Sequence, residues 1–113
     1  MKQLKGRVAV VTGAASGIGL AMARRFAADG MKLVMADIET GPLARALAEI
    51  QAAGAQAIAH PVDVMAEDQV NALADAAFGH FGAVHVLCNN AGVAAPALRT
   101  RAWESTIADW QWI

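Results

Sequence analysis

Residues 8–19 read VAVVTGAASGIG, and this stretch decides the fold of the chain. The valine-rich run that ends at Thr12 is too short for a helix and is typical of a strand buried inside a parallel sheet. Three glycines follow it before a helical pattern begins. We expect Gly13 to let the chain leave the strand in a tight turn, Gly17 to let a ligand approach the backbone, and Gly19 to let the helix lie close to the sheet.

The glycine turn is a candidate site for a pyrophosphate. A helix that begins near Ile18 points its unpaired N–H groups and the positive end of its dipole at the turn, which stabilises a bound anion by roughly 0.3–1 kcal/mol. The glycines are spaced G-x-x-x-G-x-G rather than G-x-G-x-x-G, and such a turn can also be a structural link with no ligand. Other residues of the chain have to show whether the turn binds a pyrophosphate or is only a structural link.

Length and composition limit the class of protein. At 113 residues the chain is one domain, residues 1–113. It lacks the ~18 consecutive apolar residues of a membrane span, and its charged residues 1–7 precede no small-residue cleavage site, so we expect neither a membrane segment nor a signal peptide. A net charge of −1 gives no support for binding to nucleic acid or a membrane surface. The single cysteine, Cys88, excludes an internal disulfide, which favours the cytoplasm.

Strand and helix patterns alternate along the chain. Strands are expected at residues 7–12, 32–36, 56–61 and 84–88, and helices at about 17–28, between Thr40 and Gly54, at 67–78 or a little beyond, and from Ile107 onward. Short connections of this kind make right-handed crossovers and a parallel sheet, with the strands in the order 3-2-1-4 and helices on both faces. The predicted fold is a Rossmann-like doubly wound α/β sheet that is incomplete at its C-terminal side.

Each of the first three expected helices carries an apolar stripe that should face the sheet. Thr40 is expected to cap the second helix, with Pro42 in its first turn, and Thr106 with Asp109 to cap the last one. The stripes are Ile18, Met22 and Phe26 in the first helix, Leu43, Leu47 and Ile50 in the second, and Val70, Leu73, Ala77 and Phe81 in the third.

Polar residues and glycines follow the strands at the edge where a ligand would bind. The strand order reverses between the first and fourth strands, and ligands of such sheets bind outside the carboxyl ends of the strands at this reversal. The residues that follow strand ends are Gly13, Asp37, Asp63, Asn89 and Asn90. We expect them to converge on one crevice.

Asp37 lies at the end of the second strand, about 20 residues beyond the glycine turn, where an acidic side chain can accept both hydroxyls of an adenosine ribose. Such charge-assisted hydrogen bonds contribute ~1.5–3 kcal/mol. The same carboxylate would repel a 2′-phosphate, and the next residue is Ile38 rather than a lysine or arginine. NAD is therefore preferred over NADP; the alternative is a turn aspartate that precedes the next helix and binds nothing.

Two further motifs follow the third and fourth strands. Asp63 and the adjacent backbone N–H could hold an adenine edge while Val64 packs on its face; the alternative is an Asx turn after a proline. The N-N-A-G sequence at residues 89–92 places two amides and a glycine beside the crevice. We expect it to tie strand ends together and to pass close to a ribose, the alternative being a turn with self-bonding asparagines.

Four motifs together resemble the N-terminal half of the short-chain dehydrogenase/reductases: T-G-x-x-x-G-I-G at residues 12–19, Asp37, Asp63 with Val64, and N-N-A-G at residues 89–92. The match covers nearly the whole chain. The resemblance implies a Rossmann fold that binds NAD(P) in an oxidoreductase acting on an alcohol or ketone. It assigns the phosphates to Gly13, Ser16, Gly17, Ile18 and Gly19, the adenosine ribose to Asp37, adenine to Asp63 and Val64, and a place near the cofactor ribose to Asn90, Ala91 and Gly92.

The chain departs from that family where the chemistry would be. The family uses a Tyr-x-x-x-Lys pair, whose tyrosine is the general acid/base, with an upstream serine and an asparagine in the helix that here begins near Ile107. This chain has no tyrosine, its last lysine is Lys32, and Ser105 comes too early to be the catalytic serine. No catalytic residue is assigned, and we expect a truncated cofactor-binding half of an enzyme that forms a homo-oligomer.

Two other functions remain open on the sequence. One is a self-contained, non-catalytic nucleotide-binding module that covers the exposed edge of strand 84–88 by self-association. The other is a methyltransferase, which uses a similar glycine turn for a different adenosine ligand. Cys88 is expected in the core, the histidines have no metal-ligand spacing, and Trp103, Trp110 and Trp112 form the apolar face of an interrupted helix.

Overall fold

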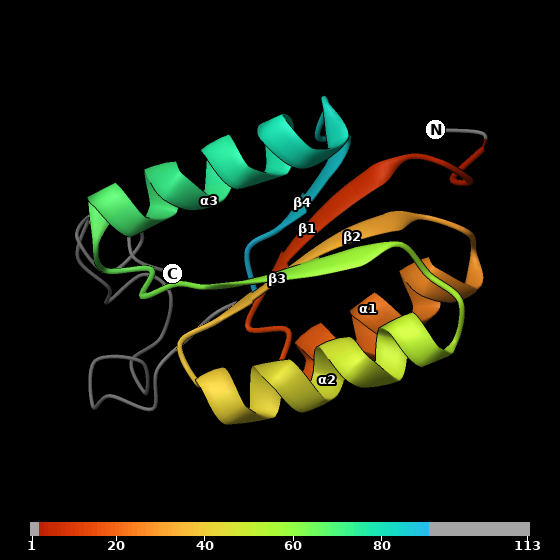
Figure 1. Cartoon of the computed structure of the whole chain (residues 1–113), viewed down its shortest axis with the longest axis horizontal. Coiled ribbons are helices and arrows are strands. Elements are labelled where there is room, and N and C mark those ends of the chain that lie inside the picture. The colour runs from red at the N-terminus through yellow and green to blue at the C-terminus, as the bar shows by residue number, and fades with distance from the viewer. Residues whose placement is uncertain (1–2, 91–113) are drawn as a thin grey trace, which may run out of the picture.

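β1 (Val8–Thr12) is the strand around which the fold is built. The computed structural model describes residues 3–90. After β1 come α1 (Gly17–Ala28), β2 (Lys32–Asp37), α2 (Thr40–Ala52), β3 (Ala57–Pro61), α3 (Glu67–Phe81) and β4 (Val86–Cys88). The alternation of strands and helices predicted for this part of the chain is confirmed (Figure 1).

The four strands form one parallel sheet in the order β3-β2-β1-β4. Val10 of β1 is in register with Val34 of β2 on one side and with Leu87 of β4 on the other, and Val34 is in register with Ile58 of β3. The predicted strand order and the Rossmann-like class are confirmed. Because the order reverses between β1 and β4, the carboxyl ends of these strands define the expected ligand edge.

The helices form a layer on each face of the sheet. Figure 1 shows α1 and α2 together on one face and α3 alone on the other. Successive residues of β1 alternate between the faces: Ala9 and Val11 belong to the core under α1 and α2, and Val10 belongs to a smaller core under α3. All of β1 is buried, which explains why its sequence is apolar without alternation.

The buried face of α1 is turned by one position from the predicted stripe. Ile18 is 72% exposed, whereas Gly19 and Ala23 are the buried residues of α1. Met22 and Phe26 flank the core and are half-buried. One residue turns a helix by about 100°, and the face without a side chain at Gly19 approaches the sheet most closely. The predicted core position of Ile18 is therefore wrong.

The start of α2 also differs from the prediction. Its N-cap is Glu39, and Thr40 already belongs to the helix, so the predicted cap at Thr40 is wrong. The Asp37 carboxylate accepts the Glu39 N–H at 3.0 Å, and the Glu39 carbonyl oxygen accepts the Leu43 N–H at 3.0 Å. Asp37 thus fixes the residue that caps α2.

The other boundaries agree with the predictions within three residues. β4 begins at Val86 rather than at residue 84, and α3 continues to Phe81 before Gly82 ends it with a φ of 79°. The helix predicted from Ile107 and the three tryptophans lie outside the described residues. Among residues 3–90, no helix combines the length and the hydropathy needed to cross a bilayer.

Candidate functional site

The turn between β1 and α1 has the backbone conformation that its glycines allow. Gly13 has a φ of 65° and Gly17 a φ of 58°, both in the left-handed region, where other residues are strained. Ser16, the N-cap of α1, is extended, and its side chain makes no capping hydrogen bond. Ser16 and Gly17 are exposed, so the first N–H groups of α1 are presented to solvent, as an anion site requires.

Gly19 is the most tightly packed position of the turn. A Cβ atom placed on it would lie 2.0 Å from the carbonyl oxygen of Gly13 and 2.7 Å from Nδ2 of Asn90. No side chain fits there without moving the backbone of the turn. The close packing predicted at Gly19 is confirmed, and Asn90 is brought from the end of β4 to the same place.

Asp37 reaches from the end of β2 to the glycine turn. Its Oδ2 accepts a hydrogen bond from the Ala15 N–H at 3.0 Å, and its Oδ1 accepts the Glu39 N–H at 3.0 Å. The backbone adds another tie, because the Ala14 N–H donates to the Ala36 carbonyl oxygen at 3.0 Å. An ionised carboxylate has about four acceptor positions, so about two remain for hydroxyl groups of a ligand.

The tip of β3 lies beside the tip of β2. The Val62 N–H donates to the Asp37 carbonyl oxygen at 3.0 Å, which places Asp63 at the same edge of the sheet. Oδ1 of Asp63 accepts the Met65 N–H at 3.0 Å, so the Asx turn that was the alternative interpretation is present. Val64 is half-buried against the core under α3. Adenine binding by Asp63 and Val64 stays a prediction.

Thr12 joins the two strands at the reversal, a role that the motif around it did not predict. Its hydroxyl donates to the Cys88 carbonyl oxygen at 3.2 Å and accepts the Asn90 N–H at 3.0 Å. Only 5% of Thr12 is exposed. The signal that could have revealed it is a single hydroxyl at the end of a strand otherwise made of valine and alanine, because a buried polar group needs a partner.

Large apolar side chains are exposed at the same ends of the strands. Ile18 follows the glycine turn, Ile38 follows β2 and Met65 lies in the turn after β3, and they are 72%, 59% and 68% exposed. These three side chains offer apolar surface at the edge where we expect a ligand to bind. An aromatic base bound at this edge would cover surface that water now contacts.

The end of β4 completes the described part of the site. Asn90 is its last described residue, and Ala91 and Gly92 lie outside. Cys88 is half-buried beside the core under α1 and α2, and burial raises the pKa of its thiol, which disfavours the nucleophilic thiolate. Within residues 3–90, no group of three or more His, Cys, Asp or Glu side chains could hold a metal ion.

A family match agrees with this geometry. The chain matches the family described as short chain dehydrogenase over residues 7–110. It therefore belongs to that family, and the resemblance predicted from its four motifs is confirmed. The parallel order and the flanking helices described above are those of a Rossmann-like member of this family.

Particular relatives show how much of such a protein the chain represents. It is 53% identical over 90 residues to 1-deoxy-11-beta-hydroxypentalenate dehydrogenase of Streptomyces arenae, covering 80% of this chain and 32% of the relative. A short chain dehydrogenase/reductase from Burkholderia phymatum, solved in complex with NAD, is 51% identical with a TM-score of 0.82, over 99% of this chain and 39% of that one. L-Sorbose reductase from Gluconobacter frateurii, complexed with NADPH and L-sorbose, is 32% identical with a TM-score of 0.79, over 97% and 41%. The chain thus spans about a third to two fifths of these relatives.

Proposed function

We propose that this chain is the dinucleotide-binding part of an oxidoreductase that transfers hydride between NAD and an alcohol or ketone. The observation that carries the proposal is the Asp37 carboxylate, held 3.0 Å from the Ala15 N–H of the glycine turn. A ribose on Asp37 would lie beside a pyrophosphate at the start of α1, and one dinucleotide contains both groups. Membership of the short chain dehydrogenase family supports the same ligand.

The proposed site residues divide according to the part of the dinucleotide that they hold. The turn binds the pyrophosphate with backbone N–H groups at the start of α1, and Asp37 accepts the ribose hydroxyls. Bound NAD supplies the hydride acceptor, while these residues bind and orient it. The proposed set is Gly13, Ser16, Gly17, Ile18 and Gly19 for the phosphates, Asp37 for the adenosine ribose, Asp63 and Val64 for adenine, and Asn90, Ala91 and Gly92 near the cofactor ribose.

The charge of Asp37 supports NAD rather than NADP. The 2′-phosphate of NADP would bring negative charge next to this carboxylate, and like charges at contact distance disfavour binding. The exposed residue that follows is Ile38, which offers no compensating cation. The family does not decide the question, because the Burkholderia phymatum structure holds NAD and the Gluconobacter frateurii structure holds NADPH.

Calorimetric titration of the 113-residue chain with NADH, NADPH and S-adenosylmethionine tests the proposal. We expect NADH to bind at least about tenfold more tightly than NADPH, a difference of ~1.4 kcal/mol. Asp37→Asn removes the charge and should narrow the ratio of the two Kd values. Both cofactors report on the same folded population, so this ratio is independent of any loss of stability. Asp75→Asn makes the same charge change on α3 and should leave the ratio unchanged.

Each outcome of this titration decides between functions. Heat of binding from S-adenosylmethionine alone would overturn the proposal in favour of the methyltransferase. Equal Kd values for NADH and NADPH in the wild-type chain would contradict the proposed contact between Asp37 and the adenosine ribose. The non-catalytic module is not favoured, because relatives such as the Streptomyces arenae protein bear the names of dehydrogenases and reductases.

Location and assembly belong to the same proposal. We place the whole protein in the cytoplasm, because a single cysteine in this chain suits a reducing compartment, and we expect it to be a homo-oligomer. Cell fractionation and sedimentation of the full-length protein test these two points. A protein recovered only as a monomer would contradict the second.

A further inference from the structure

The glycine turn is held to the end of β2 by two hydrogen bonds. The Ala14 N–H donates to the Ala36 carbonyl oxygen at 3.0 Å. The Ala15 N–H donates to Oδ2 of Asp37, also at 3.0 Å. Because the first bond joins two backbone groups, the bond to Asp37 is the one of the two that a substitution can remove. Only 7% of Ala15 is exposed, so its N–H group would be left unsatisfied at a buried position, which is costly.

The N-cap of α1 does not fix the turn with its own side chain. Ser16 makes no side-chain capping hydrogen bond, although a serine at this position normally accepts one of the first N–H groups of the helix. The residue before it, Ala15, is held instead by a carboxylate from the neighbouring strand. The first N–H groups of α1 are thus not taken up by the Ser16 hydroxyl, and the turn is fixed from outside.

The carboxylate of Asp37 is itself fixed from the side of α2. Its Oδ1 accepts the Glu39 N–H at 3.0 Å, and Glu39 is the N-cap of α2. α1 and α2 lie side by side on one face of the sheet (Figure 1). Asp37 therefore bonds to residues at the start of two neighbouring helices, whose positive ends favour a carboxylate. With both oxygens bonded, the side chain is oriented before a ligand arrives.

We propose that Asp37 is a positioning residue for the pyrophosphate, in addition to its proposed contact with the adenosine ribose. Its carboxylate holds Ala15, and this bond sets the direction in which the turn enters α1. The first N–H groups of α1 are thereby kept in the arrangement that an anion needs. This role rests on the proposed function, which places a pyrophosphate at the turn.

Asp37 has two effects on a bound anion, and they have opposite signs. Its negative charge repels a phosphate, so loss of the charge at this exposed edge should strengthen binding by about twofold. Loss of the hydrogen bond lets the turn adopt other conformations, and the apparent affinity falls with the fraction of molecules that remain competent. A hydrogen bond to a charged group corresponds to about tenfold or more in an equilibrium constant. The positioning effect should therefore exceed the effect of the charge.

Inorganic pyrophosphate tests the positioning role separately from the ribose. Titration of the 113-residue chain, followed by the NMR shifts of the Gly17 and Gly19 N–H groups, gives the Kd of the turn for this anion. We expect Asp37→Ala to weaken pyrophosphate binding by about three- to tenfold. The NMR shifts report on the folded chain, so a loss of stability does not imitate this change.

Glu39→Gln is the matched control for the charge. It removes one carboxylate two residues from Asp37 and keeps the N–H group that Asp37 accepts. The Glu39 side chain is exposed and makes no capping hydrogen bond. Pyrophosphate binding should therefore be unchanged or strengthened by up to about twofold. Two substitutions that remove the same charge at the same edge are thus expected to change the Kd in different ways.

Asp37→Asn carries the test if Asp37→Ala does not fold. An asparagine oxygen can accept one of the two N–H groups, so its loss of affinity should lie between the wild-type chain and Asp37→Ala. Hydrogen exchange at the Ala15 N–H measures the same bond with no ligand present. The positioning role requires that this exchange rate and the Kd for pyrophosphate rise together across the variants.

The possible outcomes separate the positioning role from the proposed function. Equal or tighter pyrophosphate binding in the Asp37 variants would overturn the positioning role and leave the proposed function intact. Shifts at Gly17 and Gly19 with NADH but none with pyrophosphate would also overturn it, because the turn would then bind no phosphate independently of the ribose. No shift with either ligand would overturn the proposed function, and the role of Asp37 with it.

Discussion

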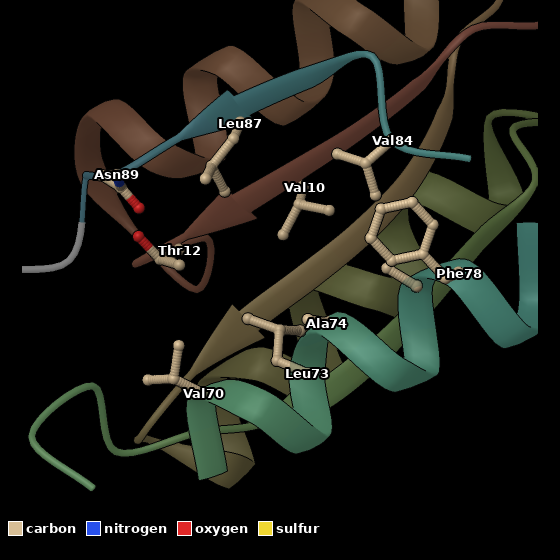
Figure 2. Close-up of a pocket in the computed structure, with 10 residues that line it drawn as sticks. Val10, Thr12, Val70, Leu73, Ala74, Phe78, Val84, Leu87 and Asn89 are labelled. Atoms are coloured by element: carbon tan, nitrogen blue, oxygen red, sulfur yellow. The ribbon is translucent and has the colours of Figure 1, made fainter. Parts of the chain in front are cut away.

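The two faces of the sheet are covered to different extents. Under α1 and α2, Leu33 is fully buried, and the guanidinium of Arg24 donates two hydrogen bonds to Glu49, at 2.6 and 2.7 Å, between the two helices. Under α3 the buried cluster is smaller, and Phe78 remains 55% exposed beside an apolar groove of about 340 Å³ between α3 and the edge of the sheet (Figure 2). One face is closed by protein in residues 3–90, and the other is open.

The two faces therefore differ in their relation to the proposed site, because the closed face supports the ligand edge. The glycine turn leads into α1, and Asp37 fixes both the turn, through Ala15, and the start of α2, through Glu39. The proposed site therefore rests on the closed face. Changes to the closed face should affect both stability and cofactor affinity, whereas changes to the open face should affect stability with little change in cofactor affinity.

Leu33→Ala is the substitution with the largest expected effect. It removes a fully buried side chain from the closed face and should lower the free energy of unfolding by about 2–5 kcal/mol. Leu73→Ala lies beside the groove, where water reaches the space that it leaves, and should fall at or below the lower end of that range. Urea unfolding measures both. Equal losses would show that the two faces are packed alike.

Gly19→Ala should have the next largest effect. The added Cβ would lie 2.0 Å from the Gly13 carbonyl oxygen, so the turn has to move, at a cost of about 1–3 kcal/mol and with a loss of NADH affinity. Gly79→Ala on α3 is the matched control. Apart from its chain neighbours and the backbone of its own helix, no atom lies within 4 Å of a Cβ added there. Alanine in a helix should stabilise the chain by about 0.5–1 kcal/mol. Thermal unfolding of the two variants should therefore shift in opposite directions.

Thr12→Val tests the connection between the end of β1 and the end of β4, at the reversal of strand order. Valine keeps the shape but removes the hydroxyl that donates to the Cys88 carbonyl oxygen and accepts the Asn90 N–H. Loss of these bonds should cost about 0.5–1.5 kcal/mol each. Hydrogen exchange should quicken at the Asn90 N–H and stay unchanged at the Lys32 N–H, which donates to Arg7. Equal quickening at both would point to global destabilisation instead.

The fold was predictable because its decisive signals are local. Short, mostly apolar runs followed by glycine, aspartate or asparagine define the strands. Short connections with right-handed crossovers then leave the order 3-2-1-4. The same kind of local signal predicted Asp37 at the end of the second strand, and Asp37 is the last residue of β2. Each of these inferences needs only neighbouring residues and the geometry of a parallel sheet.

The contacts that complete the site were not predictable in this way. Thr12 meets Asn90 across 78 positions of the chain, and Asn90 approaches Gly19 only because β4 pairs with β1. The cap at Glu39 depends on a carboxylate two residues earlier, a bond that competes with the local preference for Thr40. Ile18 fits a helical stripe, but the absent side chain of Gly19 decides which face packs.

Glu49→Gln should have the smallest effect, and its pH dependence identifies the cause. The hydrogen bond from Arg24 lowers the pKa of Glu49. Both side chains are exposed to solvent, so the pair contributes little. A carboxyl group whose pKa is lower in the folded chain contributes stability above its unfolded pKa and loses it as the pH falls through the folded pKa.

At pH 7 the wild-type chain should therefore unfold at a slightly higher temperature than the Glu49→Gln variant. The difference should shrink as the pH falls below about 4.3, the ordinary value for glutamate, and vanish once the carboxyl group is protonated in the folded chain. Added salt at pH 7 should reduce it as well, because exposed charges are screened. A difference in unfolding temperature that persists in acid would mean that the α1–α2 contact depends on the packing of the Glu49 side chain. The ion pair with Arg24 would then contribute nothing to the stability of the closed face.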